Sequence, residues 1–322
     1  MLARKPITAG LADYLDNRRL RESWEPMALE IVKKQSDRIS EATRPIGVFD
    51  SGLGGLTVAQ AMHRHLPAES LIYFGDTARL PYGTKSPRTV LQFARQCLRF
   101  LMQMNPKLLV VACNTVSATA LQDLLAEFSV PVIGVLEPGA EAAVRLARRQ
   151  RPTGDCAIGL LATEATIASR AYVQALNRRD AAVHLVGRAC PLLVPMIEEG
   201  RAEDSSVVQA VLAEYLAPLK SLNPPALILG CTHYPIYAKT ISRLMGPLTT
   251  LVDSADQTAL VVREKLTTMA ALHPGEPEDG TLTCYVTDQG QRFESLANRF
   301  LGRAISQPVW VDPEVLETAS TE

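Results

Sequence analysis

The sequence predicts an α/β protein made of two pseudo-symmetric, three-layer domains with mostly parallel sheets and an active site in the cleft between them. Eight short apolar segments form two series with nearly the same spacing. They begin near Ile46, Leu71, Leu108 and Val132, and near Ala157, Val183, Ala226 and Leu251. Each gap leaves room for a crossover helix, which is the pattern of a parallel sheet. The matching spacing of the two series indicates two related domains.

The segments between the strands fit helices. Residues 87–104 and 204–219 carry apolar side chains at helical spacing. A further apolar strand at residues 282–287 and a helix near residues 291–301 follow the second series, and their spacing leaves open which sheet they join. Cys97 falls on the apolar face of the first helix, and Cys156 and Cys284 fall in strands, so we expect these three thiols to be structural.

Composition excludes several classes of protein. The chain has 322 residues, 47% of them hydrophobic, and a formal net charge of −1 with no basic stripe, so nucleic acid is not an expected partner. No apolar run reaches the roughly 18 residues of a membrane span, and the amino terminus lacks a signal peptide. We therefore expect a cytoplasmic protein. Its six cysteines include no CxxC pair, which argues against a structural metal and against a disulfide scaffold.

Two segments of the chain are near copies of one another. LLVVACNTVSATAL at residues 108–121 and ALILGCTHYPIYAK at residues 226–239 both read as a buried strand, a cysteine and a helix. Cys113 and Cys231 thus lie at the carboxyl ends of equivalent strands, where open α/β sheets bind ligands. We expect them to be the only two of the six cysteines in the cleft.

Two thiols facing one carbon can invert a stereocentre without a cofactor. A free cysteine has a pKa of roughly 8.5, which a helix amino terminus lowers, so each thiol is expected to act as base or acid near neutral pH. Three alternatives are open at this point. The buried cysteines can be purely structural, a single cysteine can act as a nucleophile with His233 as its base, or the pair can form a catalytic disulfide.

Polar residues follow other strands of the two series. Asp50 and Ser51 open a glycine-rich turn that lacks the GxGxxG order of dinucleotide-binding proteins, and its free N–H groups suit a small anion. Residues 75–86 hold Asp76 and Arg79, which form either part of a site or a solvated surface turn. In the second domain, Thr163 and Thr166 either cap a helix or contact a ligand.

Five segments together resemble the glutamate racemases of the aspartate/glutamate racemase superfamily. They are FDSGLGGL at 49–56, GDTARLPYGTKS at 75–86, VACNTVSA at 111–118, PVIGVLEPG at 131–139 and LGCTHYP at 229–235. The resemblance covers roughly residues 45–310. It implies a cofactor-independent and metal-independent interconversion of L-glutamate and D-glutamate, which supplies D-glutamate for peptidoglycan, by a protein that forms a homodimer.

The resemblance also implies roles for individual residues. Cys113 resembles the base that acts on D-glutamate and Cys231 the base that acts on L-glutamate. Asp50 and His233 resemble their assisting groups, and Glu198 a supporting acid. The implied substrate contacts are Ser51, Pro81, Tyr82, Gly83, Asn114, Thr115, Thr163, Thr166 and Thr232.

The implied domain organisation is discontinuous. Residues 45–138 and 255–312 form the first domain, residues 139–254 the second, and residues 313–322 a tail. Residues 1–44 form an extension in which residues 22–35 are predicted to be an amphipathic helix. The extension is either an appendage or a segment that regulates the protein or contacts another subunit. Its presence also raises the hypothesis that a peptidoglycan precursor activates the protein.

The sequence departs from the family pattern in one segment, and two alternative functions stay open. The segment ATEAT at residues 162–166 has Glu164 and Ala165 where a glycine-containing turn is commoner in the family. Within the superfamily, aspartate racemisation or a related proton transfer would use the same two thiols. From a different class, a non-catalytic regulatory binding protein is the remaining alternative.

Overall fold

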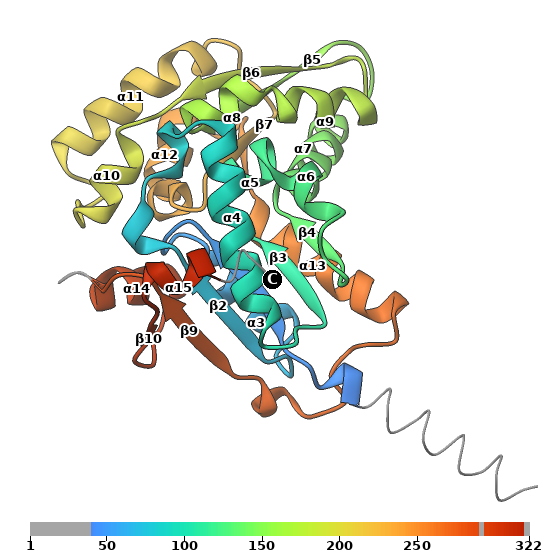
Figure 1. Ribbon diagram of the computed structural model, residues 1–322. Helices are drawn as coiled ribbons and strands as arrows, with labels where there is room; N and C mark the ends of the chain where they lie inside the picture. The colour runs from blue at the N-terminus through green and yellow to red at the C-terminus, as the bar shows by residue number, and fades with distance from the viewer. Residues whose placement is uncertain (1–39, 290–292, 319–322) are drawn as a thin grey trace, which may run out of the picture.

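The computed structural model describes residues 40–289 and 293–318, which fold around two parallel β-sheets (Figure 1). The first sheet contains β1 (Ile46–Asp50), β2 (Leu71–Gly75), β3 (Leu108–Val111), β4 (Val132–Gly134), β9 (Leu282–Val286) and β10 (Val309–Trp310). The second contains β5 (Cys156–Ala162), β6 (Val183–Ala189), β7 (Ala226–Gly230) and β8 (Thr250–Asp253). All eight strand starts expected from the two series agree with the observed strands to within about one residue.

Both sheets repeat one order of strands. The first sheet runs β10-β9-β2-β1-β3-β4 and the second β6-β5-β7-β8, and every recorded pairing is parallel. The direction of strand addition therefore reverses between β1 and β3 in the first domain, and between β5 and β7 in the second. Ligands of open α/β sheets bind at such switch points, at the carboxyl ends of the strands. The two pseudo-symmetric α/β domains predicted from the sequence are confirmed.

Helices cover both faces of each sheet (Figure 1). In the first domain they are α3 (Leu56–His65), α4 (Pro87–Met102), α5 (Asn114–Thr119), α6 (Leu121–Leu125), α13 (Ser254–Thr268), α14 (Phe293–Leu301) and α15 (Pro313–Thr318). In the second they are α7 (Leu136–Gln150), α8 (Glu164–Ser169), α9 (Ala171–Arg179), α10 (Leu193–Glu198), α11 (Ser206–Lys220) and α12 (Ala238–Met245). The helices predicted over residues 87–104 and 204–219 correspond to α4 and α11. Short 3₁₀ turns are η1 (Thr77–Arg79), η2 (Tyr82–Thr84), η3 (Tyr234–Tyr237) and η4 (Pro277–Asp279).

The central strands of the first sheet are buried on both faces. Val48 and Val110 pack on the side of α3, whereas their neighbours Phe49 and Val111 pack on the side of α4, as the alternation of side chains along a strand requires. Continuous apolar strands are the signature of such doubly covered parallel sheets. Cys97, Cys156 and Cys284 are buried in these cores, as predicted for structural thiols.

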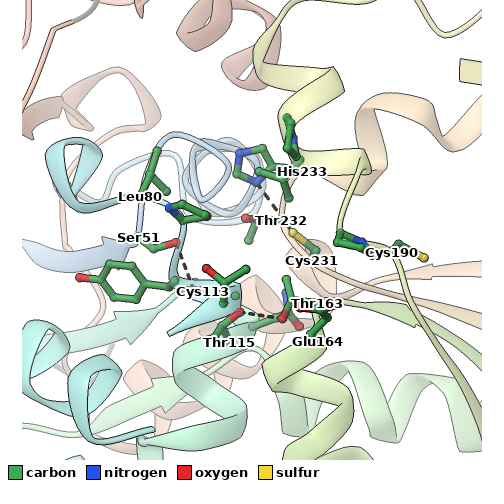
Figure 2. A pocket seen from close by; sticks show the side chains of 18 residues that line it. Ser51, Leu80, Cys113, Thr115, Thr163, Glu164, Cys190, Cys231, Thr232 and His233 are labelled. Atoms are coloured by element: carbon green, nitrogen blue, oxygen red, sulfur yellow. Dashed lines mark hydrogen bonds between the residues drawn. The ribbon is translucent and has the colours of Figure 1, made fainter. Parts of the chain in front are cut away.

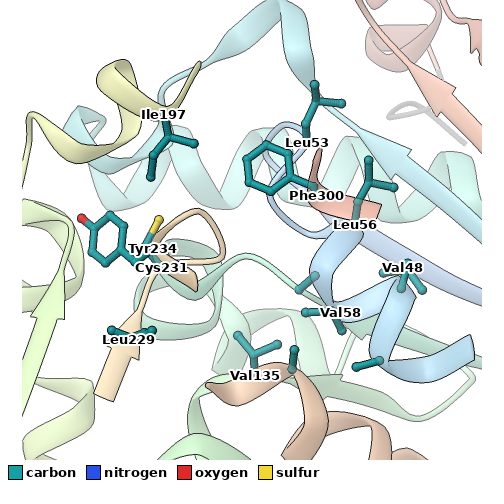
Figure 3. Packing of buried hydrophobic residues seen from close by; sticks show 14 of the residues in the cluster. Val48, Leu53, Leu56, Val58, Val135, Ile197, Leu229, Cys231, Tyr234 and Phe300 are labelled. Carbon is teal, nitrogen blue, oxygen red and sulfur yellow. The ribbon is translucent and has the colours of Figure 1, made fainter. Parts of the chain in front are cut away.

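One apolar core joins the two domains. Figure 3 shows Val48 and Leu56 of the first domain in the same cluster as Leu229 and Tyr234 of the second, with Phe300 of α14 between the two groups. The carboxyl ends of β1 and β7 are thereby held near each other. This packing fixes where the loops after those strands meet.

The end of the chain returns to the first sheet. β9 pairs with β2 over its full length and β10 pairs with β9, which answers the question that the sequence left open. Residues 313–322 were expected to form a tail, and α15 lies within them. Leu316 of this helix is fully buried against the core beside α4, so α15 packs on the first domain. The exact domain boundaries stay predictions.

The predicted helix over residues 22–35 lies outside the residues that the structure describes. Within residues 40–289 and 293–318, no helix is both long enough and apolar enough to span a membrane.

Candidate active site

A cavity of about 170 Å³ lies between the two domains, at the carboxyl ends of their strands (Figure 2). It is smaller than the roughly 300–1,000 Å³ of pockets for drug-sized ligands and suits a small metabolite. The cavity is lined by Ser51, Leu80, Pro81, Tyr82, Gly83, Thr84, Cys113, Asn114, Thr115, Thr163, Glu164, Cys190, Pro191, Val194, Pro195, Cys231, Thr232 and His233.

Cys113 occupies the first-domain side of the cavity. It is the residue that precedes α5, and its Sγ lies 3.4 Å from the Ser51 hydroxyl, which accepts its hydrogen bond. Asp50, at the end of β1, lies behind Ser51 and is fully buried, and its Oδ2 accepts a hydrogen bond of 2.9 Å from the Gly52 N–H. A buried carboxylate therefore lies beside the Cys113 thiol.

Cys231 occupies the second-domain side and has different partners. Its Sγ lies 3.8 Å from Nδ1 of His233 (Figure 2). Nε2 of the same imidazole lies 3.0 Å from Oε1 of Glu198. The Phe300 ring packs edge-on against the imidazole, with a centroid separation of 5.1 Å. Sulfur, imidazole and carboxylate thus form a connected chain in which His233 is held between two acidic groups.

The two sides differ in their electrostatics. Burial, reinforced by the charge of Asp50, raises the pKa of Cys113 to about 12. Burial also raises the pKa of Asp50, although the charge of His233 acts in the opposite direction. Burial by itself would lower the pKa of His233, but its hydrogen bonds to Cys231 and Glu198 and their charges raise it to about 10. The expectation that a helix amino terminus would lower the pKa of Cys113 is wrong, because burial beside a carboxylate outweighs the helix.

Hydrogen bonds to the buried carboxylate of Asp76 hold the turn that carries Pro81 and Gly83. The Tyr82 hydroxyl donates to Oδ2 of the fully buried Asp76, which also accepts from Arg79 Nε at 2.7 Å and from the Thr287 hydroxyl at 3.1 Å. Arg79 is not the solvated arginine of a surface turn, since only 14% of its side chain is exposed. The Tyr82 ring packs against the Phe93 ring, with a centroid separation of 5.8 Å, so the side chain anchors the turn in the core of the first domain.

Contacts between the domains surround the cavity. The hydroxyls of Thr115 and Thr163 lie 3.0 Å apart, one from each domain. A Cβ added at Gly83 would lie 2.8 Å from Cβ of Thr163, and one added at Gly54 would lie 2.5 Å from Nδ1 of His233. A side chain at either position would therefore overlap a residue of the other domain unless that residue moved. Thr163 caps α8 by accepting from the Thr166 N–H, as predicted. Thr163 also lines the cavity, and its contact with a ligand stays a prediction.

The structure brings most of the predicted site residues together. Asp50, Glu198 and Thr166 do not line the cavity. Each lies one contact behind it, through Ser51, His233 and Thr163 respectively. The remaining predicted residues line it directly.

Sequence reasoning missed part of the wall. The missed residues are Leu80, Thr84, Glu164, Cys190, Pro191, Val194 and Pro195. Four of them lie in the loop after β6, the counterpart of β2. The repeat pointed to this loop, but only Glu198 was singled out in it, because its prolines and apolar side chains carry no chemical signal. Cys113 and Cys231 both line the cavity, but the prediction that they are the only two of the six cysteines there is wrong, because Cys190 also lines it. Figure 2 shows its sulfur directed away from Cys113 and Cys231, and the thiol contacts the Arg188 carbonyl at 3.4 Å.

Metal-ligating groups do not gather at the site. Among the described residues, no three side chains of His, Cys, Asp or Glu are placed to hold a metal ion. The polar side chains at the cavity are hydroxyls, one carboxamide, three thiols, one imidazole and the carboxylate of Glu164. Such groups can bind carboxylates and an ammonium group and can transfer protons.

An α/β protein in which Cys113 of one domain and Cys231 of the other line a single cavity, each beside its own ionisable partner, has the arrangement of acid–base enzymes that act on small molecules. A sequence profile described as Asp/Glu/Hydantoin racemase matches residues 46–261. The chain is 46% identical to a glutamate racemase of Geobacter metallireducens over 259 residues, which cover 80% of this chain and 93% of that protein. The chain belongs to the Asp/Glu/hydantoin racemase family.

Solved structures agree with this assignment. A glutamate racemase of Francisella tularensis in complex with D-glutamate has a TM-score of 0.77 and 36% identity, covering 86% of this chain and 99% of the other. A glutamate racemase of Escherichia coli in complex with L-glutamate and the activator UDP-MurNAc-ala has a TM-score of 0.62 and 26% identity, covering 80% and 95%.

Proposed function

We propose that this protein interconverts L-glutamate and D-glutamate by a two-base transfer of the α-proton, which supplies D-glutamate for peptidoglycan. The observation that carries the proposal is the pair of thiols, one from each domain, on a single cavity of about 170 Å³. The similarity to glutamate racemases selects glutamate as the substrate.

The proton transfer follows from the charges around each thiol. With L-glutamate bound, the Cys231 thiolate takes the α-proton, and the electron pair of the broken C–H bond moves onto Cα and its carboxylate. The Cys113 thiol then donates its proton to the opposite face, which gives D-glutamate and a Cys113 thiolate. The reverse reaction begins with that thiolate, so no cofactor is required.

The neighbouring residues have supporting roles in this proposal. His233, which is protonated near neutral pH, stabilises negative charge on the Cys231 sulfur, and Glu198 orients the imidazole. Asp50 lies beside Cys113 and assists its loss or gain of a proton. The proposed substrate contacts are the cavity-lining residues Ser51, Pro81, Tyr82, Gly83, Asn114, Thr115, Thr163 and Thr232, with Thr166 supporting Thr163.

The test is racemisation of L-glutamate in deuterium oxide, followed by NMR and chiral chromatography. Two separate bases give D-glutamate that carries solvent deuterium from its first appearance, while the remaining L-glutamate keeps its α-hydrogen. Cys113→Ser and Cys231→Ser should each lower kcat by at least about 10²-fold, the lower range for loss of a general acid or base. Full racemisation by both variants would rule out the mechanism.

The same assay with L-aspartate tests the substrate. Aspartate is one methylene shorter, a difference that a pocket distinguishes by about 10- to 200-fold in kcat/KM. We expect glutamate to be preferred by a factor in this range. Preference for aspartate would contradict the assignment of the substrate but leave the two-base mechanism intact.

The expected partners and location extend the proposal. The structure of a glutamate racemase of E. coli contains the activator UDP-MurNAc-ala. We propose that the same precursor activates this protein, and the racemisation rate with and without it is the test. A rate that is unchanged by the precursor would remove this idea. A homodimer and a cytoplasmic location are proposed by resemblance to the family, and the mass of the protein in solution measured by light scattering tests the first.

A further inference from the structure

A buried tyrosine of the second domain contacts the residue that follows Cys113 in the first domain. The Tyr172 hydroxyl, on α9, donates a hydrogen bond of 2.7 Å to Oδ1 of Asn114, the first residue of α5. Tyr172 is 1% exposed and Asn114 is 3% exposed. Asn114 lines the cavity, whereas Tyr172 does not. The tyrosine can therefore influence a bound substrate only through the asparagine.

The hydrogen bond fixes which end of the asparagine amide is available to the cavity. A carboxamide has an oxygen that accepts hydrogen bonds and an NH₂ group that donates two, and the two ends have nearly the same shape. A buried tyrosine hydroxyl needs an acceptor for its proton. In the described part of the chain, the recorded acceptor for Tyr172 is Oδ1 of Asn114. With the oxygen engaged, the NH₂ group remains for a ligand in the cavity.

We propose that Tyr172 is a positioning residue for racemisation, which holds Asn114 so that its NH₂ group donates to a carboxylate of the amino-acid substrate. The inference rests on the proposed function, because only an anionic substrate requires donors at this point. Without the tyrosine hydroxyl, the amide is free to turn, and its oxygen then faces the substrate carboxylate and repels it.

The location of the contact adds a second consequence. Tyr172 belongs to the second domain and Asn114 to the first, and the neighbouring Thr115 and Thr163 hydroxyls make another contact between the domains, at 3.0 Å. The donor group of Asn114 is therefore oriented only where α9 packs against α5. The substrate site is completed by the docking of the two domains.

The experiment compares Tyr172→Phe with Tyr237→Phe. Both changes remove only a hydroxyl from a buried ring, and the Tyr237 hydroxyl donates to the Arg201 carbonyl, away from the cavity. We expect both variants to lower Tm by a similar amount. Tyr172→Phe alone should raise the KM for glutamate by about five- to tenfold, with kcat changed by less than about threefold, which is the upper part of the range for a typical hydrogen bond.

A double-mutant cycle separates positioning from a general structural effect. In an Asn114→Ala background, Tyr172→Phe should leave KM unchanged, since the residue that it positions is absent. An equal rise in KM in both backgrounds would overturn the proposal, and so would an unchanged KM for Tyr172→Phe alone. If the wild-type protein does not racemise glutamate, the proposed function fails rather than the role of Tyr172.

A second variant keeps the proposal testable if Tyr172→Phe does not fold. Asn114→Asp preserves an acceptor for the tyrosine but replaces the NH₂ group by a second oxygen. The KM for glutamate should then rise more than about tenfold, because a carboxylate would face a carboxylate. A KM equal to that of the wild type would show that Asn114 donates nothing to the substrate.

Discussion

Cys113 and Cys231 are equivalent by position but not by charge. Cys113 is buried beside Asp50, and its raised pKa of about 12 keeps it a thiol at neutral pH. Cys231 lies 3.8 Å from an imidazole whose pKa is raised to about 10, so a cation stands beside this sulfur. In the proposed mechanism, the enzyme at rest holds a thiolate on Cys231 and a thiol on Cys113, which is the form that accepts L-glutamate.

This asymmetry predicts an order of chemical modification. Because the thiolate is the nucleophile, iodoacetamide at pH 7 should alkylate Cys231 before Cys113, as read by mass spectrometry of digests taken over time. Cys190 should react slowly, since burial raises the pKa of its thiol to about 12. In His233→Asn the alkylation of Cys231 should be about tenfold slower or more, because the adjacent cation is lost. Earlier alkylation of Cys113 would contradict the assigned resting state.

The raised pKa of Cys113 also predicts how stability depends on pH. A thiol with a folded pKa of about 12 and an ordinary value of 9.0 contributes stability that is fully present below pH 9 and is lost as the pH rises towards 12. Urea unfolding should show the wild type losing about 1 kcal/mol per pH unit more than Cys113→Ala between pH 9 and pH 10.5. Parallel slopes for the two proteins would mean that the thiol is not buried as described.

At the scale of elements, the glycine-rich turn after β1 sets the distance between the domains at the site. Gly54→Ala would place a methyl group against Thr232 and His233. A displacement of about 1 Å in a catalytic group can cost roughly 10²-fold, so kcat/KM should fall by about that factor with the secondary structure retained. Circular dichroism checks the fold, and a kcat/KM within twofold of the wild type would show that the turn can yield.

The sequence was most informative about elements with local signals. Apolar runs located β1 to β8, and the repeated strand and cysteine located Cys113 and Cys231, because those patterns depend on neighbours along the chain. The contact between Glu198 and His233 joins residues that are 35 positions apart and have no shared periodicity, so only resemblance to the family suggested it. Tyr172 carried no signal, since a tyrosine on an amphipathic helix reads as core.

Electrostatics at the site was predicted least well. A helix amino terminus can be read from the sequence around Cys113, but the burial of Asp50 beside that thiol is set by the packing of two domains. The position of Cys190 at the cavity was not predicted for the same reason, because it depends on how the loop after β6 packs against Cys231. Tertiary burial, rather than local sequence, decided the ionisation of these groups.

At the scale of the whole molecule, a buried ion pair holds together distant parts of the first domain. Lys107 and Glu69 are 3% and 2% exposed, and the Lys107 ammonium also donates to the carbonyls of Ala42 and Ala271. The Glu69 carboxylate accepts from the His273 N–H at 2.8 Å. The pair lies at the amino-terminal ends of the strands, opposite the candidate active site.

Removal of one partner should therefore affect stability and leave catalysis unchanged. Lys107→Met leaves a buried carboxylate without its cation and should lower the free energy of unfolding by about 3–5 kcal/mol. The double variant Lys107→Met with Glu69→Leu should recover most of that loss. Urea unfolding measures both, and kcat for glutamate should stay within twofold. A lower kcat in the folded single variant would mean that the two ends of the sheet are coupled.

The chain passes between the domains twice, before α7 and again at the start of α13, and the two passages lie side by side, since a side chain on Gly139 would overlap that of Ser254. Two adjacent connections constrain the relative position of the two domains more than a single linker would, because each limits the displacement that the other allows. Since Cys113 lies in one domain and Cys231 in the other, the paired connections also limit how far the two sulfurs can be displaced from one another.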